Sequence, residues 1–108
     1  MAGPKPLSGV TIDDLLAVAL SVGAGRLELT PGHVPTVFLG SGRFPLTGYE
    51  KIKPEDYERL VGGILTDSQQ AAVFTENEEI RFGYDLEKRA AFDVAVSGRA
   101  GARFQTRP

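Results

Sequence analysis

The sequence predicts an α+β domain built on an antiparallel sheet, and three observations support this prediction. Apolar residues recur at helical spacing in stretches that begin with helix-capping signals. Short segments of alternating apolar and polar residues lie between the helices and again after them. The order is one helix, three strands, two helices and three strands, a grouping typical of antiparallel sheets rather than parallel βαβ units. We expect five to six strands, with two to three helices on one face.

The first helix should follow a flexible N-terminal arm. Residues 1–10 hold two prolines and two glycines, which indicate a loose segment. Thr11 can cap the helix together with Asp14 three residues later, and an apolar stripe follows. Gly23 then supplies the left-handed residue at which many helices stop. The folded domain is expected to span residues 11–108.

Three short strands are predicted after this helix. Residues 26–30 alternate apolar and polar side chains, as a half-buried strand does. Residues 36–39 form an apolar run, and Gly40-Ser41-Gly42 indicates a hairpin turn into residues 43–46. Pro45 cannot donate a hydrogen bond to a neighbouring strand, so this last strand should lie at a sheet edge or end early.

Two further helices and three further strands complete the prediction. Proline is favoured at the first helical position, so the second helix should begin at Pro54. Residues 66–69, Thr-Asp-Ser-Gln, form a full capping box, so a third, short helix should start there and end near Glu76-Asn77. Alternating patterns predict strands around residues 80–84 and 92–96 and, after a tight connection, a return strand over 102–106.

Charge is spread unevenly along a chain whose net charge is only −2. Residues 50–80 carry eight acidic and three basic side chains, whereas residues 81–108 carry three acidic and six basic ones. One interpretation is solvated helix faces and strand edges. The other is two surfaces of opposite sign that dock onto complementary partners. The overall balance gives no positive field that would attract nucleic acid or an anionic membrane.

Several classes of site lack the residues they need. There is no cysteine among the 108 residues, which excludes disulfides and thiolate zinc sites. His33 is the one histidine and falls in a predicted loop, so neither a metal nor a catalytic role is expected. The N-terminus is too polar for a signal peptide and no apolar run could span a bilayer, so we expect a cytoplasmic protein without membrane insertion.

Four stretches carry a family resemblance. Residues 25–32 (GRLELTPG) are similar to a strand of the type SDLHLTPG, and residues 34–46 (VPTVFLGSGRFPL) to a hairpin PPxIRVDGxLRPL. Residues 52–70 (IKPEDYERLVGGILTDSQQ) match LTPEDVERLLxxILTDEQ most closely, and residues 80–108 resemble DFSYxLxxxxRFRVNVFRQRGG…FRxIP. In this order they resemble the N-terminal domain of the PilT/GspE class of type IV pilus and type II secretion ATPases. The resemblance implies a PAS-like sheet.

The departures from this family concern nucleotide chemistry. The phosphate-binding signature G-x-x-x-x-G-K-[ST] does not occur in these residues, so they provide no site for phosphoryl transfer. The resemblance implies arginines on either side of a phenylalanine that help to reach a nucleotide; here Ala91 and Asp93 flank Phe92, and Gln105 replaces another arginine. We therefore expect a stand-alone, divergent copy that has kept the fold and lost the nucleotide contacts.

The resemblance implies a non-catalytic interaction domain that needs no cofactor. In the family, the N-terminal domain packs on the motor of a neighbouring subunit, so this chain should bind a pilus or secretion ATPase or another motility component. Arg99, Arg103 and Arg107 on the last hairpin are the expected contacts, although they could instead serve solubility and edge protection. Self-association stays open, and the alternative function is a PAS-like module that senses a small molecule.

An enzyme is not expected from the remaining polar residues. Glu76, Glu78 and Glu79 form an acidic cluster in a predicted turn, where nothing would separate their pKa values for acid–base work. No nucleophile-elbow signature is present to build a triad around the single histidine. The basic residues of the last hairpin are not interleaved with aromatic residues that could stack on nucleobases.

Overall fold

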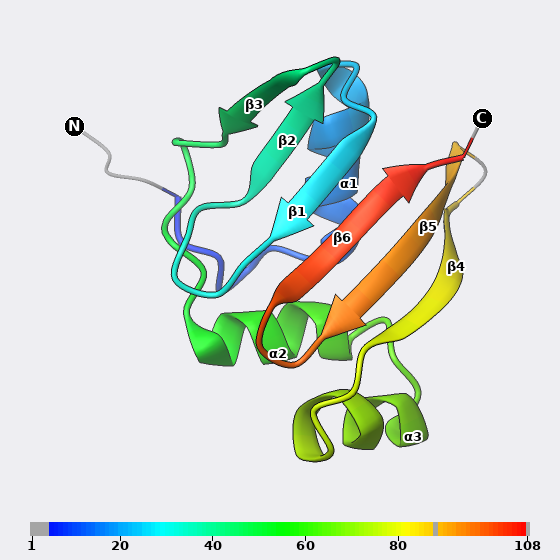
Figure 1. Ribbon diagram of the computed structural model, residues 1–108. Coiled ribbons are helices and arrows are strands. Elements are labelled where there is room, and N and C mark those ends of the chain that lie inside the picture. Colours follow the sequence, from blue (N-terminus) through cyan, green and yellow to red (C-terminus); the bar gives the residue numbers. More distant parts are fainter. Residues whose placement is uncertain (1–4, 88, 108) are drawn as a thin grey trace.

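The computed structural model describes residues 5–87 and 89–107. One six-stranded sheet, in the order β3-β2-β1-β6-β5-β4, carries two helices across one of its faces (Figure 1). All neighbouring strands are antiparallel, so the predicted fold class is confirmed. The elements in chain order are α1 (Ile12–Ser21), β1 (Arg26–Leu29), β2 (Thr36–Leu39), β3 (Gly42–Pro45), α2 (Pro54–Gly62), α3 (Asp67–Gln70), a π-helical turn (Ala71–Thr75), β4 (Ile80–Leu86), β5 (Ala90–Ser97) and β6 (Gly101–Thr106).

The sheet consists of two three-stranded halves that meet between β1 and β6. Strands β1 to β3 come from the first half of the chain and β4 to β6 from the second. At the junction Leu27 pairs with Phe104 and Glu28 with Arg103. β3 forms one edge and ends at Pro45, as predicted, and the longer β4 forms the other. The central pairing therefore depends on contacts between residues far apart in sequence.

The helix boundaries agree with the capping signals. Thr11 and Asp14 form the reciprocal capping box before α1, and Gly23 after its end has a left-handed φ of 77°. α2 begins at Pro54, and Thr66 and Gln69 form the second capping box before α3. α3 holds only four residues before the chain passes into the π-helical turn, which ends next to Glu76.

The core lies between the sheet and its two covering helices. Figure 1 shows α1 and α2 behind the sheet, with α3 beyond its end. Leu15 and Leu16 of α1 and Phe92 and Phe104 of the sheet are all fully buried in one cluster. The Tyr57 hydroxyl of α2 donates a hydrogen bond to the Ser97 carbonyl of β5, so this buried phenol is satisfied.

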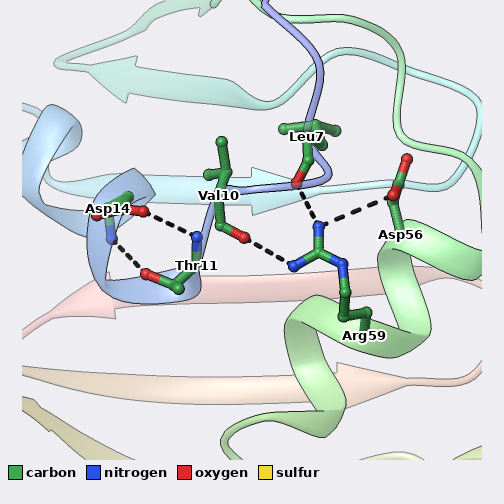
Figure 2. Close-up of polar contacts among 6 residues, drawn as sticks. All are labelled: Leu7, Val10, Thr11, Asp14, Asp56 and Arg59. Atoms are coloured by element: carbon green, nitrogen blue, oxygen red, sulfur yellow. Dashed lines mark hydrogen bonds and ion pairs between the residues drawn. The ribbon is translucent and has the colours of Figure 1, made fainter.

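The N-terminal segment differs from the predicted loose arm. Residues 1–4 lie outside the described residues, but Leu7 and Val10 are buried in the core. Figure 2 shows the cause: the Arg59 guanidinium of α2 donates to the Leu7 carbonyl and, at 2.8 Å, to the Val10 carbonyl. Asp56 lies 3.8 Å from the same guanidinium. The prolines and glycines predicted a flexible segment, but the Arg59 side chain, 49 residues after Val10, holds it against α2.

Removing the hydrogen bonds from Arg59 to the Leu7 and Val10 carbonyls, which we call the Arg59 clasp, should measurably destabilise the domain. We expect Arg59→Ala to lower the free energy of unfolding by roughly 2 kcal/mol, because two charge-assisted hydrogen bonds are lost at a partly exposed site. Amide exchange at Val10, whose N–H bonds to the Leu7 carbonyl, should become faster. Denaturant unfolding and hydrogen exchange measure both effects. Glu58→Ala, an exposed neighbour on α2, is the matched control, and equal losses in both variants would contradict the role of the clasp.

Tyr84 joins β4 to the start of α1, and its raised pKa predicts that stability depends on pH in the alkaline range. Its hydroxyl donates to the Asp13 carboxylate. Burial, with this hydrogen bond and the Asp13 charge, raises the pKa of Tyr84 to about 12 from a usual value of 10.0. Burial also raises the pKa of Tyr57, despite its bond to the Ser97 carbonyl. Both phenols are held protonated more tightly in the folded state.

Stability should therefore fall above pH 10 and keep falling to about pH 12. The stabilisation by these tyrosines is fully present at a pH where they are protonated in both the folded and the unfolded chain. It is lost as the pH rises from the pKa of the unfolded chain to that of the folded state, because the unfolded chain deprotonates first. Urea unfolding between pH 9 and pH 12 measures the slope. The double variant Tyr57→Phe with Tyr84→Phe should show a shallower decline than the unaltered protein. An unchanged slope would show that other groups cause the alkaline loss.

Candidate interaction surface on the open sheet face

The sheet face opposite the helices is uncovered and carries most of its charged side chains. Because successive strand residues point to opposite faces, β6 directs Ala102 and Phe104 to the core and Arg103 and Gln105 outward. The same alternation leaves Asp93 of β5 exposed. Five arginines and three acids lie on this face, which we call the open face: Arg26, Arg43, Arg81, Arg103 and Arg107 with Glu28, Asp85 and Asp93.

A hollow of about 590 Å³ lies on the open face over β4, β5 and β6. Gly83 and Ala95 form its floor, where they present almost no side chain. Charged and polar side chains surround that floor. The lining residues are Arg81, Phe82, Gly83, Asp93, Val94, Ala95, Arg103, Gln105 and Arg107.

Arg107 lies across the strands at one side of this hollow. Its backbone N–H continues the ladder by donating to the Ala91 carbonyl at 2.9 Å. Its Nε donates to Asp93 Oδ1 at 2.7 Å, and this bond and the carboxylate charge raise the pKa of the guanidinium. A Cβ at position 83 would collide with the Arg107 guanidinium, so glycine there makes room for it. Arg107 is therefore paired within the domain.

The other arginines of the open face differ in how far they are neutralised. Arg26 stacks over the Phe38 ring at 4.4 Å from its centroid. Its Nε lies 3.2 Å from Glu28 Oε2 but makes no aligned hydrogen bond, so we regard this as an ion pair only. Arg81 lies 3.4 Å from Glu79 through two well-exposed side chains. Among the described residues neither Arg43 nor Arg103 forms an ion pair, and of these two Arg103 lies in the middle of the sheet, on β6.

The three predicted contact residues do not all lie on the same surface. Arg103 and Arg107 share the open face, whereas Arg99 lies in the turn between β5 and β6, whose amides bond to Ser97 Oγ. Arg81 was not predicted from the sequence. Period-two alternation predicts which face of the sheet Arg81 is on, but it does not predict which strand lies beside β4. The outward-facing row across three strands became visible only with the strand order.

The remaining candidates lie elsewhere. His33 is exposed in the loop before β2, beside a small hollow of about 100 Å³. Glu76, Glu78 and Glu79 are exposed between the π-helical turn and β4. Within residues 5–87 and 89–107, no group of three or more histidine, aspartate or glutamate residues is placed to hold a metal ion. In the same residues, no helix combines the length and apolar character required to cross a membrane.

The fold is one that also occurs as part of a pilus retraction motor and as part of an ATPase. The chain is similar to part of the pilus retraction motor PilT, solved with bound ADP, with 22% identity and a TM-score of 0.78 over 92% of this chain and 29% of that one. It is also similar to part of the Legionella pneumophila ATPase DotB, with 15% identity and a TM-score of 0.78 over 100% of this chain and 31% of that one. Comparisons with protein-family profiles and with curated proteins found no match.

These likenesses concern the fold. The chain spans less than a third of the length of either ATPase, and both identities are low. The resemblance seen in the sequence, to one domain of pilus and secretion ATPases, is thus confirmed as a likeness of architecture. Function still has to be argued from the surface that this chain presents.

Proposed function

We propose that this protein is a non-catalytic interaction domain that binds a pilus or secretion ATPase, or another component of such a machine, through the open face of its sheet. The observation that carries the proposal is the asymmetry of the sheet: α1 and α2 bury one face, while the other presents five arginines to solvent in a fold shared with pilus motors. An uncovered, charged sheet face suits a partner that supplies complementary charge.

The lack of nucleotide-binding residues supports a non-catalytic role. The 108 residues contain no G-x-x-x-x-G-K-[ST] loop to hold a triphosphate. At the strand where the family resemblance implies phosphate-reaching arginines, Asp93 faces outward instead and pairs with Arg107. This strand therefore lacks the pair of arginines that the resemblance implies for a nucleotide contact.

Affinity capture from a lysate of the native host tests the proposal. The tagged full chain should retain a pilus or secretion ATPase, or a motility protein, in amounts well above those retained by a tagged unrelated domain. The variant Arg103→Glu with Arg107→Glu should retain much less, because two positive charges of the open face are reversed. Arg99→Glu, in the turn outside this face, is the matched control. Absence of any such protein among specific partners would refute the proposed function.

The small-molecule alternative stays a prediction. The hollows of the described residues lie at the surface, and none of their linings gathers polar groups around an enclosed space. A thermal-shift screen across a metabolite panel tests this alternative directly. A reproducible rise in melting temperature with one compound would support it over the protein-binding role.

A further inference from the structure

Arg81, Ala95 and Arg103 form one row across the open face. Arg81 pairs with Ala95 between β4 and β5, and Ala95 pairs with Arg103 between β5 and β6. Two strand spacings therefore separate the arginine backbones, about 10 Å. Both long side chains stand beside a methyl group, and Gly83 lies diagonally beyond it on β4. Because the Arg107 guanidinium lies over Gly83, the row is a socket with a cationic wall on each side and the Ala95 methyl group as its floor.

Two acids, Glu28 and Glu79, line a small hollow with Ala95 and Arg103, but each of them is paired with another arginine. Asp93 is engaged by Arg107 at 2.7 Å, and Glu28, the cross-strand neighbour of Arg103, lies against Arg26. Arg81 is held by Glu79 alone, at 3.4 Å, with 72% and 52% of the two side chains exposed. Such an exposed pair contributes little and exchanges readily for a better acceptor. Arg103 is paired with no acid in the part of the chain that the structure describes.

We infer that this socket binds a carboxylate side chain from an acidic segment of a protein partner, held between Arg81 and Arg103 above Ala95. The inference rests on the proposed function and names the chemistry by which the partner is recognised. Guanidinium groups bind carboxylates through paired, charge-assisted hydrogen bonds, and two of them on opposite walls fix both position and orientation. The amide of Gln105, which also lines the hollow, adds a neutral hydrogen-bonding group at its rim.

The surroundings favour an acidic protein segment over nucleic acid. The arginines of this face are interspersed with acids rather than extended as a continuous basic stripe along which a phosphate backbone could lie, and the chain carries a net charge of −2. The aromatic ring of Phe38 on this face is covered by Arg26, so it offers no free platform for a base.

The test is an NMR titration of the ¹⁵N-labelled full chain with an acetylated hexaglutamate peptide, a hexalysine peptide and inorganic phosphate. Hexaglutamate should shift the amide signals of Arg81, Ala95 and Arg103, and the effect should weaken with added salt. Hexalysine should shift none of them. If phosphate shifts these signals and hexaglutamate does not, or if hexaglutamate shifts only signals outside the row, the inference is overturned.

Two variants sharpen the result. Arg103→Gln should weaken hexaglutamate binding by about two- to fivefold, as loss of one exposed ion pair predicts, while Arg99→Gln should leave it unchanged. Ala95→Glu places a carboxylate in the socket itself and should prevent binding; the spectrum of each variant shows whether it is folded. Binding by Ala95→Glu at the affinity of the unaltered chain would refute the socket.

The outcomes separate this inference from the proposed function. If a pilus or secretion ATPase is captured equally by the unaltered chain and by Arg103→Gln, the proposed function holds and the socket is wrong. If hexaglutamate binds in the row but no such ATPase or motility protein is captured, the socket holds and the proposed function is wrong.

Discussion

Replacing Gly101 with alanine should lower the free energy of unfolding by about 3 kcal/mol, a large part of the stability of a domain of this size. Gly101 has a φ of 108°, a conformation that side-chain-bearing residues rarely adopt. A Cβ there would also collide with the Leu29 carbonyl oxygen and lie 3.2 Å from the Thr30 Cα. The strain falls where β6 joins β1, so the pairing that unites the two halves of the sheet is affected.

Denaturant unfolding of Gly101→Ala measures this effect. The matched control is Gly48→Ala, because a Cβ at Gly48 meets no atom within 4 Å and the backbone is not left-handed there. The control should unfold within about 0.5 kcal/mol of the unaltered protein. Equal unfolding midpoints for the two variants would show that β1 and β6 tolerate a wider spacing than the structure indicates.

Truncation of Phe104 to alanine should cost about 4 kcal/mol of stability. The ring is 0% exposed and lies on β6 between Leu27 of β1 and Val94 of β5, in the middle of the sheet. Its removal leaves a cavity where the two halves of the sheet share their core. The closely packed neighbours on β1 and β5 limit how far the structure can relax to fill it.

Phe44→Ala is the matched control for this prediction. Phe44 lies on the edge strand β3 and is 52% exposed, so its truncation should cost less than about 1 kcal/mol. Thermal unfolding of both variants under identical conditions makes the comparison. A loss from Phe44→Ala as large as that from Phe104→Ala would mean that the edge strand is covered in solution, for example by another copy of the chain.

Much of the local structure could be predicted from the sequence, because its signals are short-range. Thr11 with Asp14 and Thr66 with Gln69 form capping boxes that need only a few neighbouring residues to take effect. Pro54 begins its helix for the same kind of reason. Four strands were predictable from period-two alternation, and β2 and β3 from an apolar run followed by a turn. The prediction for residues 1–10 was wrong where the structure describes them, because Arg59 lies far along the chain.

The candidate site was predictable only in part. Arg103 and Arg107 were named from the sequence because they fall on the last hairpin, and both lie on the open face. Arg99 was grouped with them by its proximity in sequence, but it lies in the turn. Arg81 was missed because it lies near Arg103 only through the strand pairing of both residues with Ala95. Alanine has no functional side chain that would draw attention to this position.

The sequence by itself determined the order and boundaries of the helices and strands, the α+β class, and the absence of a triphosphate-binding loop from these 108 residues. Capping, turn chemistry and periodicity act within a few residues, so they can be inferred without the fold. Only the tertiary structure decided that β1 lies against β6, that one sheet face stays open, and that Arg81 and Arg103 stand on either side of Ala95. Strand order and register result from packing between distant segments, which no local pattern encodes.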